Sequence, residues 1–411
     1  MPAPENPPPP PPPDAPSAPP PATPSAPDGP PSSRPPAALS AAAFASTFDR
    51  FAITPMLVLI ATAMDVPLGT AVAAASGYFL AYGLSQPVWG LLSDRFGRVR
   101  LMRVTLLAAA VAGALSAAAP TMAVLVAART VAGACFGAVI PTSLTYLGDT
   151  VPGARRQRAL SDLMAVTALG TALATAVGGA LSHWLDWRAV FAAPAVCAAV
   201  CSFALRTLPE PDRASATGLG THLGTVLRNR WALLVFGLAF VEGAVLLGTM
   251  TLLAAALQSR GVDSAVAGLA TAAYGAGVVG FTRLVKALSD RVPVWALIGV
   301  GGAQISVGYG VVAGRIGLAT VVLTALLLGG GWSFMHSSLQ TWATSVVPAA
   351  RGTAVAFFAA ALFVGSSVAS SAAGPLAEHH RYPLLFGIAA LAAIPLTLTA
   401  VTGRRRWPEG R

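Results

Sequence analysis

The sequence is poor in charged residues and in cysteine, and it contains a single lysine. Only 10% of its 411 residues are charged, whereas 55% are hydrophobic and the mean hydropathy is +0.67. This balance excludes an ordinary soluble enzyme and indicates a chain that crosses a membrane many times. The three cysteines lie in apolar stretches without neighbouring histidine or carboxylate, so they predict no metal site.

Other absences narrow the function. The one lysine, Lys286, is followed by Ala287, so the chain has no nucleotide-binding P-loop, and active transport would draw on an ion gradient. The glycines Gly275, Gly277 and Gly280 lie inside an apolar stretch with no preceding strand, which indicates helix packing and not a dinucleotide site. No nucleophile–base pair or metal-ligand set is visible, so we expect neither an enzyme nor a bound cofactor or metal.

The net charge of +10 does not predict a nucleic-acid partner, because the basic residues lie in short loops between apolar stretches and form no basic face. They do predict an orientation, since cytoplasmic loops of membrane proteins are enriched in arginine and lysine. If the amino terminus is cytoplasmic, twenty basic residues fall inside and four outside. We therefore expect a multi-pass protein of the cell membrane with both termini in the cytoplasm.

Apolar stretches of about 20 residues, the length of a membrane-spanning helix, follow one another along the chain. They predict an all-α polytopic membrane protein with twelve transmembrane helices in two six-helix halves. The first six stretches lie near residues 40–63, 72–92, 101–119, 122–148, 159–182 and 188–207. The last six lie near residues 231–257, 265–287, 294–313, 317–346, 352–377 and 383–402.

Composition divides the chain into five regions. The first contains an unbroken proline run from Pro7 to Pro13 and is expected to be disordered, because it has almost no apolar side chains to bury. The predicted regions are a proline-rich cytoplasmic tail (1–37), an N-terminal half (38–207), a cytoplasmic middle loop (208–230), a C-terminal half (231–402) and a basic cytoplasmic tail (403–411).

The second apolar stretch ends in a charged hairpin that reads GLLSDRFGR over residues 90–98. Its charges must lie at a membrane face, because each would cost several kcal/mol in hydrocarbon. The block G-x-L-x-D-R-x-G-R resembles the cytoplasmic signature loop of the major facilitator superfamily, and the residues that carry the resemblance are Gly90, Asp94, Arg95, Gly97 and Arg98. The resemblance implies that this loop latches the two halves in the outward-open state.

The residue types of the hairpin predict its contacts. We expect Gly90 to let the second span pack closely against a neighbour. Asp94 is expected to accept hydrogen bonds from a helix N-terminus or to pair with Arg98, and Asp149 to join the same cluster. The alternative is a plain charged loop that only orients the chain.

An internal repeat supports the two halves. Ser93-Asp94-Arg95 recurs as Ser289-Asp290-Arg291, and Val151-Pro152 recurs at the same offset as Val347-Pro348. Duplicated halves with a common register are typical of transporters. The second copy is eroded, because Lys286 and Pro293 stand where the first copy has glycines.

Ionisable residues at membrane depth are the candidates for function. Arg129 opens an R-x-x-x-G element that resembles one associated with proton coupling in the superfamily. Asp49 and Arg50 lie in the first span, where neighbouring side chains point about 100° apart and so do not face each other. Glu242 lies near the middle of the seventh span. Either Asp49 or Glu242 exchanges protons, or these carboxylates only form salt bridges to Arg129 or Arg50.

In the tenth span Trp332, His336 and Gln340 recur at four-residue spacing and so share a helix face. The family resemblance implies that the first, fourth, seventh and tenth spans line the substrate cavity. An aromatic ring, an imidazole and an amide would suit an uncharged or amphipathic organic molecule. The alternative is a polar cluster buried between helices.

The chain is thus identified as a member of the major facilitator superfamily over about residues 40–402, resembling the bacterial twelve-helix drug and arabinose-type efflux branch. The resemblance implies export of a small organic compound (a drug, metabolite or sugar) by alternating access, coupled to proton influx. It also implies a monomer whose partners are a small-molecule substrate, protons and the lipid bilayer.

The fifth span departs from the drug–proton antiporters, because Ala174-Thr175 replaces their Gly-Pro. Alternatives are facilitated uptake or uniport of a sugar or metabolite, and a non-transporting membrane sensor or scaffold.

Overall fold

The computed structural model describes residues 34–211 and 219–408, and all regular secondary structure in this part is helical. Most of the predicted proline-rich tail and the centre of the predicted middle loop lie outside these residues. The first half contains α1 (Ala37–Phe51), the 3-10 turn η1 (Thr54–Met56), α2 (Leu57–Ala63), α3 (Leu68–Phe96), α4 (Arg98–Ala117), α5 (Met122–Phe136), α6 (Val139–Thr150), α7 (Gly153–Trp184), α8 (Trp187–Ala204) and η2 (Leu205–Thr207).

After α9 (Leu219–Arg228), the second half repeats this plan. It contains α10 (Arg230–Glu242), the π-helix η3 (Gly243–Gly248), α11 (Leu253–Gln258), α12 (Ser264–Leu288), α13 (Val294–Gly314), α14 (Leu318–Gly331), the π-helix η4 (Trp332–His336), α15 (Ser337–Val346), η5 (Pro348–Ala350), α16 (Arg351–Glu378) and α17 (Tyr382–Arg406).

The predicted twelve spans agree with the structure. In the described part of the chain, eleven helical segments are long and apolar enough to cross a membrane. The remaining span is α3, which has 29 residues but carries Tyr78, Tyr82 and Gln86. All three side chains are buried between helices, so the polar groups of α3 contact protein and not lipid.

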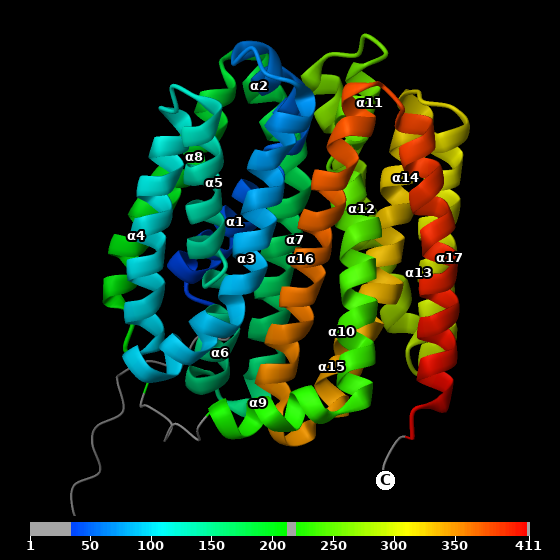
Figure 1. Ribbon diagram of the computed structural model, residues 1–411. Coiled ribbons are helices and arrows are strands. Elements are labelled where there is room, and N and C mark those ends of the chain that lie inside the picture. Colours follow the sequence, from blue (N-terminus) through cyan, green and yellow to red (C-terminus); the bar gives the residue numbers. More distant parts are fainter. Residues whose placement is uncertain (1–33, 212–218, 409–411) are drawn as a thin grey trace, which may run out of the picture. The chain divides into compact units, whose positions relative to one another are not determined.

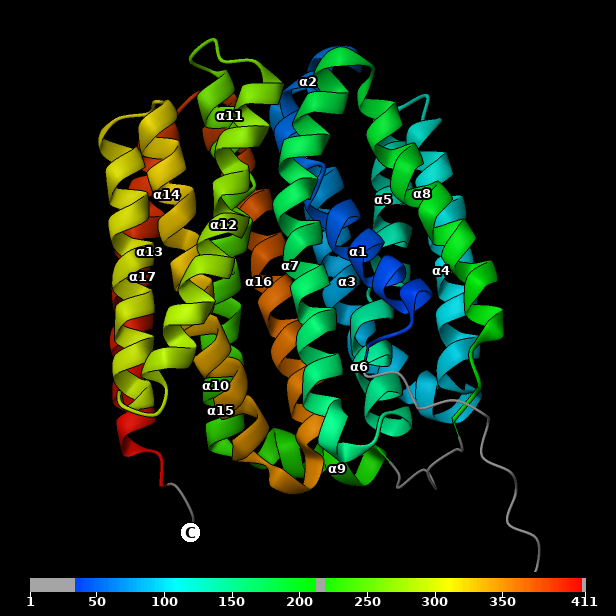
Figure 2. The same cartoon turned by 180° about the vertical axis from the view of Figure 1, so that it is seen from behind.

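The two halves meet along two pairs of helices. α3 packs against α16, and α7 packs against α12. Figures 1 and 2 show these four helices at the centre of the bundle, with α4 and α8 at one edge and α13 and α17 at the other. We call the end of the bundle where α17 ends the terminal face, and the end that carries α2 and α11 the opposite face.

Two features at the terminal face differ from the predicted regions. α9 forms a helix within the predicted middle loop and packs against α10 and α16 (Figure 1). α17 continues through Arg406, four residues past the predicted end of its span. The Arg404 guanidinium lies 4.6 Å from the Trp407 ring centroid and that of Arg405 lies 3.6 Å from the Trp295 centroid. Such contacts, and the favourable place of cations at a helix C-terminus, extend the helix.

The first, fourth, seventh and tenth spans are interrupted near their centres. The first bends through η1 at Pro55, and the fourth changes from α5 to α6 around Gly137. The seventh and tenth each contain a π-helix, η3 and η4. Short π-helical turns within α-helices are rare and often mark functional sites.

Candidate functional site

A buried ion pair joins the first and fourth spans. Nη1 of Arg129 lies 2.9 Å from Oδ1 of Asp49, and Nη2 donates a 2.9 Å hydrogen bond to the Asp49 carbonyl. The guanidinium also lies 4.5 Å from the ring centroid of Tyr78 and 4.6 Å from that of Phe191. Both partners are almost fully buried, Asp49 at 1% exposure and Arg129 at 0%. Arg129 therefore holds these helices together whatever else it does.

Arg50 points away from this pair, as the helix geometry predicts. Its guanidinium lies 4.8 to 5.1 Å from the ring centroids of Phe51, Tyr82 and Phe363. Phe363 belongs to α16 of the second half and also packs against Tyr82, with ring centroids 4.7 Å apart. The side chain of Arg50 thus lies at the contact between the halves and makes no ion pair within the described residues.

A second buried pair lies in the other half. Nδ1 of His336 lies 3.2 Å from Oε2 of Glu242, and Glu242 is fully buried. The ring of Trp332 stacks on that of His336, with centroids 3.6 Å apart and planes 17° apart. Oε1 of Glu242 has no hydrogen-bond partner in the described structure. The arginine partner that we considered for Glu242 is therefore replaced by a histidine.

The two π-helices bring this pair together. Glu242 directly precedes η3, and His336 is the last residue of η4. Gln340 lies one turn further toward the terminal face and is exposed, whereas His336 is 6% exposed. The predicted polar face of the tenth span is therefore buried at His336 and open at Gln340.

A small cavity between the halves is rich in hydroxyl groups. It measures about 10 Å³, roughly the room that one water needs. Thr175 contributes a buried hydroxyl with no hydrogen-bond partner among the described residues. The lining side chains are Phe51, Thr54, Thr171, Thr175, Met250, Thr271 and Tyr274. We call this space the central chamber.

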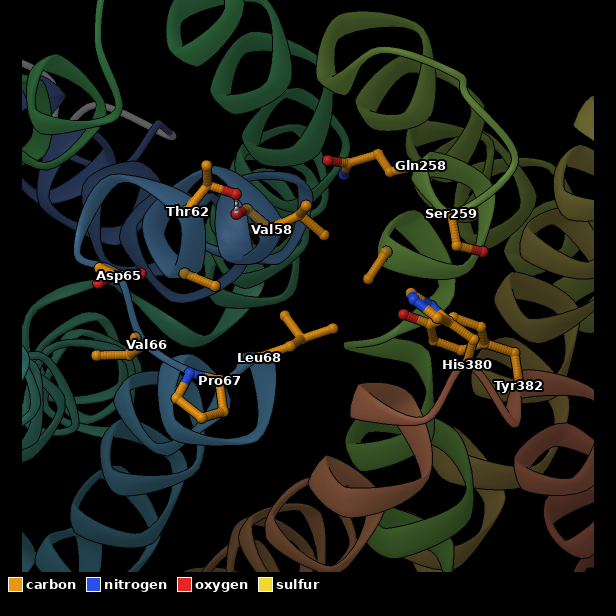
Figure 3. A pocket seen from close by; sticks show the side chains of 12 residues that line it. Val58, Thr62, Asp65, Val66, Pro67, Leu68, Gln258, Ser259, His380 and Tyr382 are labelled. Atoms are coloured by element: carbon orange, nitrogen blue, oxygen red, sulfur yellow. Dashed lines mark hydrogen bonds between the residues drawn. The ribbon is translucent and has the colours of Figure 1, made fainter.

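The chamber is sealed toward the opposite face. Every residue from Leu252 to Leu257 is buried, and Nε2 of Gln258 donates a 2.8 Å hydrogen bond to the carbonyl of Pro55 in the first half. Above this contact lies a pocket of about 470 Å³ between the halves. Figure 3 shows Thr62 and Leu68 on one side of this pocket, and Gln258 and His380 on the other.

The signature hairpin forms its own network at the terminal face. Arg98 is bonded to Asp94, and its Nε lies 3.1 Å from Oδ2 of Asp149. Both contacts agree with the predicted cluster, and all three residues belong to the first half. Arg95 and Asp290, the other charged residues singled out from the two copies of the hairpin, are exposed.

The predicted close packing at Gly90 is wrong, and Glu210 contacts the hairpin although it was not predicted to do so. A Cβ at Gly90 would meet nothing within 4 Å, because this side of α3 faces open space near the hairpin. Gly97 is the crowded glycine, and Glu210 occupies the space beside it. The carboxylate of Glu210 accepts 3.0 Å hydrogen bonds from the backbone amides of Val99 and Arg100, a role considered for Asp94. An acidic residue directly after the sixth span was the available signal, since carboxylates favour helix N-termini.

Comparison with known proteins agrees with this architecture. A chloramphenicol resistance protein of Streptomyces lividans is 28% identical over 344 residues, which cover 82% of this chain and 86% of that protein. A puromycin resistance protein of Streptomyces alboniger is 30% identical over 201 residues, 46% of this chain and 40% of that protein.

Solved structures share the fold. A nucleoside transporter superposes with a TM-score of 0.74 at 13% identity and covers 89% of this chain and 99% of its own. A D-xylose–proton symporter superposes with a TM-score of 0.70 at 18% identity, covering 87% and 95%. Residues 39–370 match the sequence profile of the Major Facilitator Superfamily. The chain belongs to the Major Facilitator Superfamily.

Proposed function

We propose that this protein exports a small uncharged or amphipathic organic compound across the cell membrane by alternating access, driven by proton influx. Both termini are cytoplasmic in this proposal, so the terminal face is the cytoplasmic one. The protein acts as a monomer and catalyses no covalent reaction. The proposed division places the first half at 38–207 and the second at 231–402.

The buried Glu242–His336 pair carries the proposal. A carboxylate and an imidazole in contact hold one proton between them as a neutral unit, and the loss of that proton leaves a negative charge at membrane depth. Such a charge is costly unless it is compensated, so proton uptake favours a closed, dry packing of the helices around the pair. Asp49 is already compensated by Arg129 at 2.9 Å, which makes it the weaker candidate for proton exchange.

The exposure of polar side chains supports one of the two states of alternating access, the inward-facing one. Gln340 and Thr341 on α15 are exposed although they lie within a membrane-spanning segment. Polar side chains avoid lipid, so the exposure of these two supports solvent access from the terminal face. The seal at Gln258 and Pro55 closes the other end, which supports an inward-facing state ready to load a cytoplasmic substrate.

The relatives support export. Two of them are named as resistance proteins for chloramphenicol and puromycin, both organic antibiotics. The rings of Phe51 and Tyr274 line the chamber and would offer stacking surface for such a molecule. The lost Gly-Pro of the fifth span leaves α7 continuous over 32 residues and does not remove any residue of the two buried pairs.

The test uses the purified full-length protein in liposomes. A growth-inhibition panel that includes chloramphenicol and puromycin first identifies a compound to which the protein gives resistance. Its transport is then measured with an imposed pH gradient and as counterflow without one. We expect Glu242→Gln to abolish gradient-driven transport and to leave counterflow, because only the proton step is lost.

Glu378→Gln is the matched control, since it makes the same change at an exposed site on the opposite face. It should leave both activities intact. Transport that is unchanged when the gradient is collapsed, or full gradient-driven transport by Glu242→Gln, contradicts proton coupling through this pair.

A further inference from the structure

The eroded copy of the signature hairpin borders a pocket at the terminal face of the second half. The pocket measures about 530 Å³. It lies between the α12–α13 turn and the end of α17. The side chains that give it its chemical character are Asp290, Arg291, Trp295, Arg404, Arg405 and Trp407.

The pocket is basic and aromatic. Three arginines and one aspartate line it, so the lining carries a net positive charge. Arg405 stacks on Trp295 at 3.6 Å, and this contact fixes the plane of the guanidinium. A fixed, planar guanidinium presents paired N–H groups that match the oxygens of a phosphate.

The position of the pocket points to a lipid. Figures 1 and 2 both show α13 and α17 at the outer edge of the bundle, away from the first half. Further along the same helices, away from the pocket, α17 exposes Leu398 at 60% and Leu391 at 67%, and α13 exposes Val307 at 56%. Exposed apolar side chains within membrane spans face lipid, so the pocket lies at the ends of two lipid-facing helices.

We propose that this pocket binds the phosphate headgroup of an anionic phospholipid, with the acyl chains along the exposed apolar side chains of α13 and α17. Basic pockets at the cytoplasmic ends of membrane helices attract anionic lipids, and tryptophan favours the membrane–water interface. The pocket lies at the ends of edge helices, where a lipid headgroup has access from the membrane, and this position favours a lipid over a soluble phosphate. The second hairpin copy has therefore become a lipid site, while the first copy keeps its internal Arg98 network.

The experiment measures lipid retention by the full-length protein with native mass spectrometry. Purified protein is mixed with equal amounts of phosphatidylglycerol and phosphatidylcholine of the same acyl chains. We expect preferential retention of phosphatidylglycerol, and a loss of about tenfold or more in that preference in the double variant Arg291→Gln/Arg405→Gln. Arg291→Lys/Arg405→Lys keeps the charge without the planar fork and should give an intermediate preference.

Two further measurements distinguish lipid binding at this pocket from a general effect of surface charge and from binding of a soluble phosphate. The matched control Arg206→Gln/Arg228→Gln removes the same charge from the terminal face at other positions and should retain the wild-type preference. Inorganic phosphate and glycerol phosphate, added in excess, should not displace the lipid. An unchanged preference in the glutamine double variant, an equal loss in the control, or displacement by either soluble phosphate would each overturn the proposal. The readout requires no transport, so it is independent of the proposed export.

Discussion

The carboxylate of Glu210 fills the space over Gly97 that any side chain at that position would need. A Cβ built on Gly97 would lie 2.7 Å from Cδ of Glu210, and the backbone there has a φ of +99°. Glu210 follows the sixth span, whereas Gly97 ends the second. The signature hairpin is therefore shaped partly by the segment that leads into the middle of the chain.

This relationship predicts a strong coupling between the two positions. Gly97→Ala should destabilise the protein by strain of the order of 1–3 kcal/mol and also by displacing Glu210. Glu210→Ala should cost about 1 kcal/mol, as expected for a lost helix cap. The double variant has no Glu210 carboxylate to displace. Its loss of unfolding free energy should therefore be smaller than the sum of the losses in the two single variants. Thermal unfolding of all four proteins measures this interaction. Strictly additive losses would show that Glu210 and Gly97 do not constrain each other.

Removing one charged partner of the Asp49–Arg129 pair should destabilise the protein more than removing both. Asp49→Asn leaves the Arg129 charge buried without a counterion, which typically costs about 3–5 kcal/mol. The double variant Asp49→Asn/Arg129→Gln removes both charges and should recover part of this loss. Unfolding midpoints of the purified variants test this order. A double variant that is less stable than Asp49→Asn would contradict it.

Gln258 should govern how often the opposite face opens. Its hydrogen bond to the Pro55 carbonyl crosses the two halves, and a single hydrogen bond contributes about 1 kcal/mol, so Gln258→Ala should raise the open population about fivefold. A cysteine at buried Leu253, in a background without the three native cysteines, reports opening through its rate of labelling by a membrane-impermeant maleimide. Thr62→Ala is the control, because Thr62 lines the same pocket but bonds only to Val58 in its own helix. Equal labelling rates in the parent and Gln258→Ala would refute this role.

Asp263 should give stability that depends on pH. It caps α12 from outside the span, and the hydrogen bond from the Val266 amide is the main cause that lowers its pKa below the usual value of 3.8. Because the pKa of Asp263 is lower in the folded state, its carboxylate stabilises the protein fully above pH 3.8. This stabilisation is lost as the pH falls through the lower pKa of the folded state. The difference in unfolding midpoint between the wild type and Asp263→Ala should therefore be constant from pH 7 to 5 and shrink toward pH 3. A difference in unfolding midpoint that grows as the pH falls would contradict the stabilising role of the ionised Asp263 side chain.

The sequence was informative where the membrane imposes a simple rule. Hydrocarbon admits helices of about 20 apolar residues, so the spans were predictable within a few residues. The hairpin cluster of Asp94, Arg98 and Asp149 was also predictable, because charges at the ends of neighbouring spans are confined to one membrane face.

Contacts between distant spans were harder to predict, because they depend on the rotation of each helix. Asp49 had two candidate arginines, and only the packing of α1 against its neighbours selects Arg129. Glu242 pairs with His336 because two π-helices set the rotation of the seventh and tenth spans, and π-helices have no clear sequence signal. Glu210 was missed because a single carboxylate after a span does not reveal which helix end it reaches.

Each π-helix adds a residue to a turn, so the two ends of that span present different sides to the same neighbours. In the seventh span, the segment before η3 offers Glu242 to His336, while the segment after it seals the route to the opposite face with Leu252 to Leu257. A straight α-helix of the same composition would have to turn one of these surfaces away from its partner. In the proposed mechanism, deleting one residue from η3 would therefore separate proton binding from closure, and the protein would leak or stall instead of coupling the two.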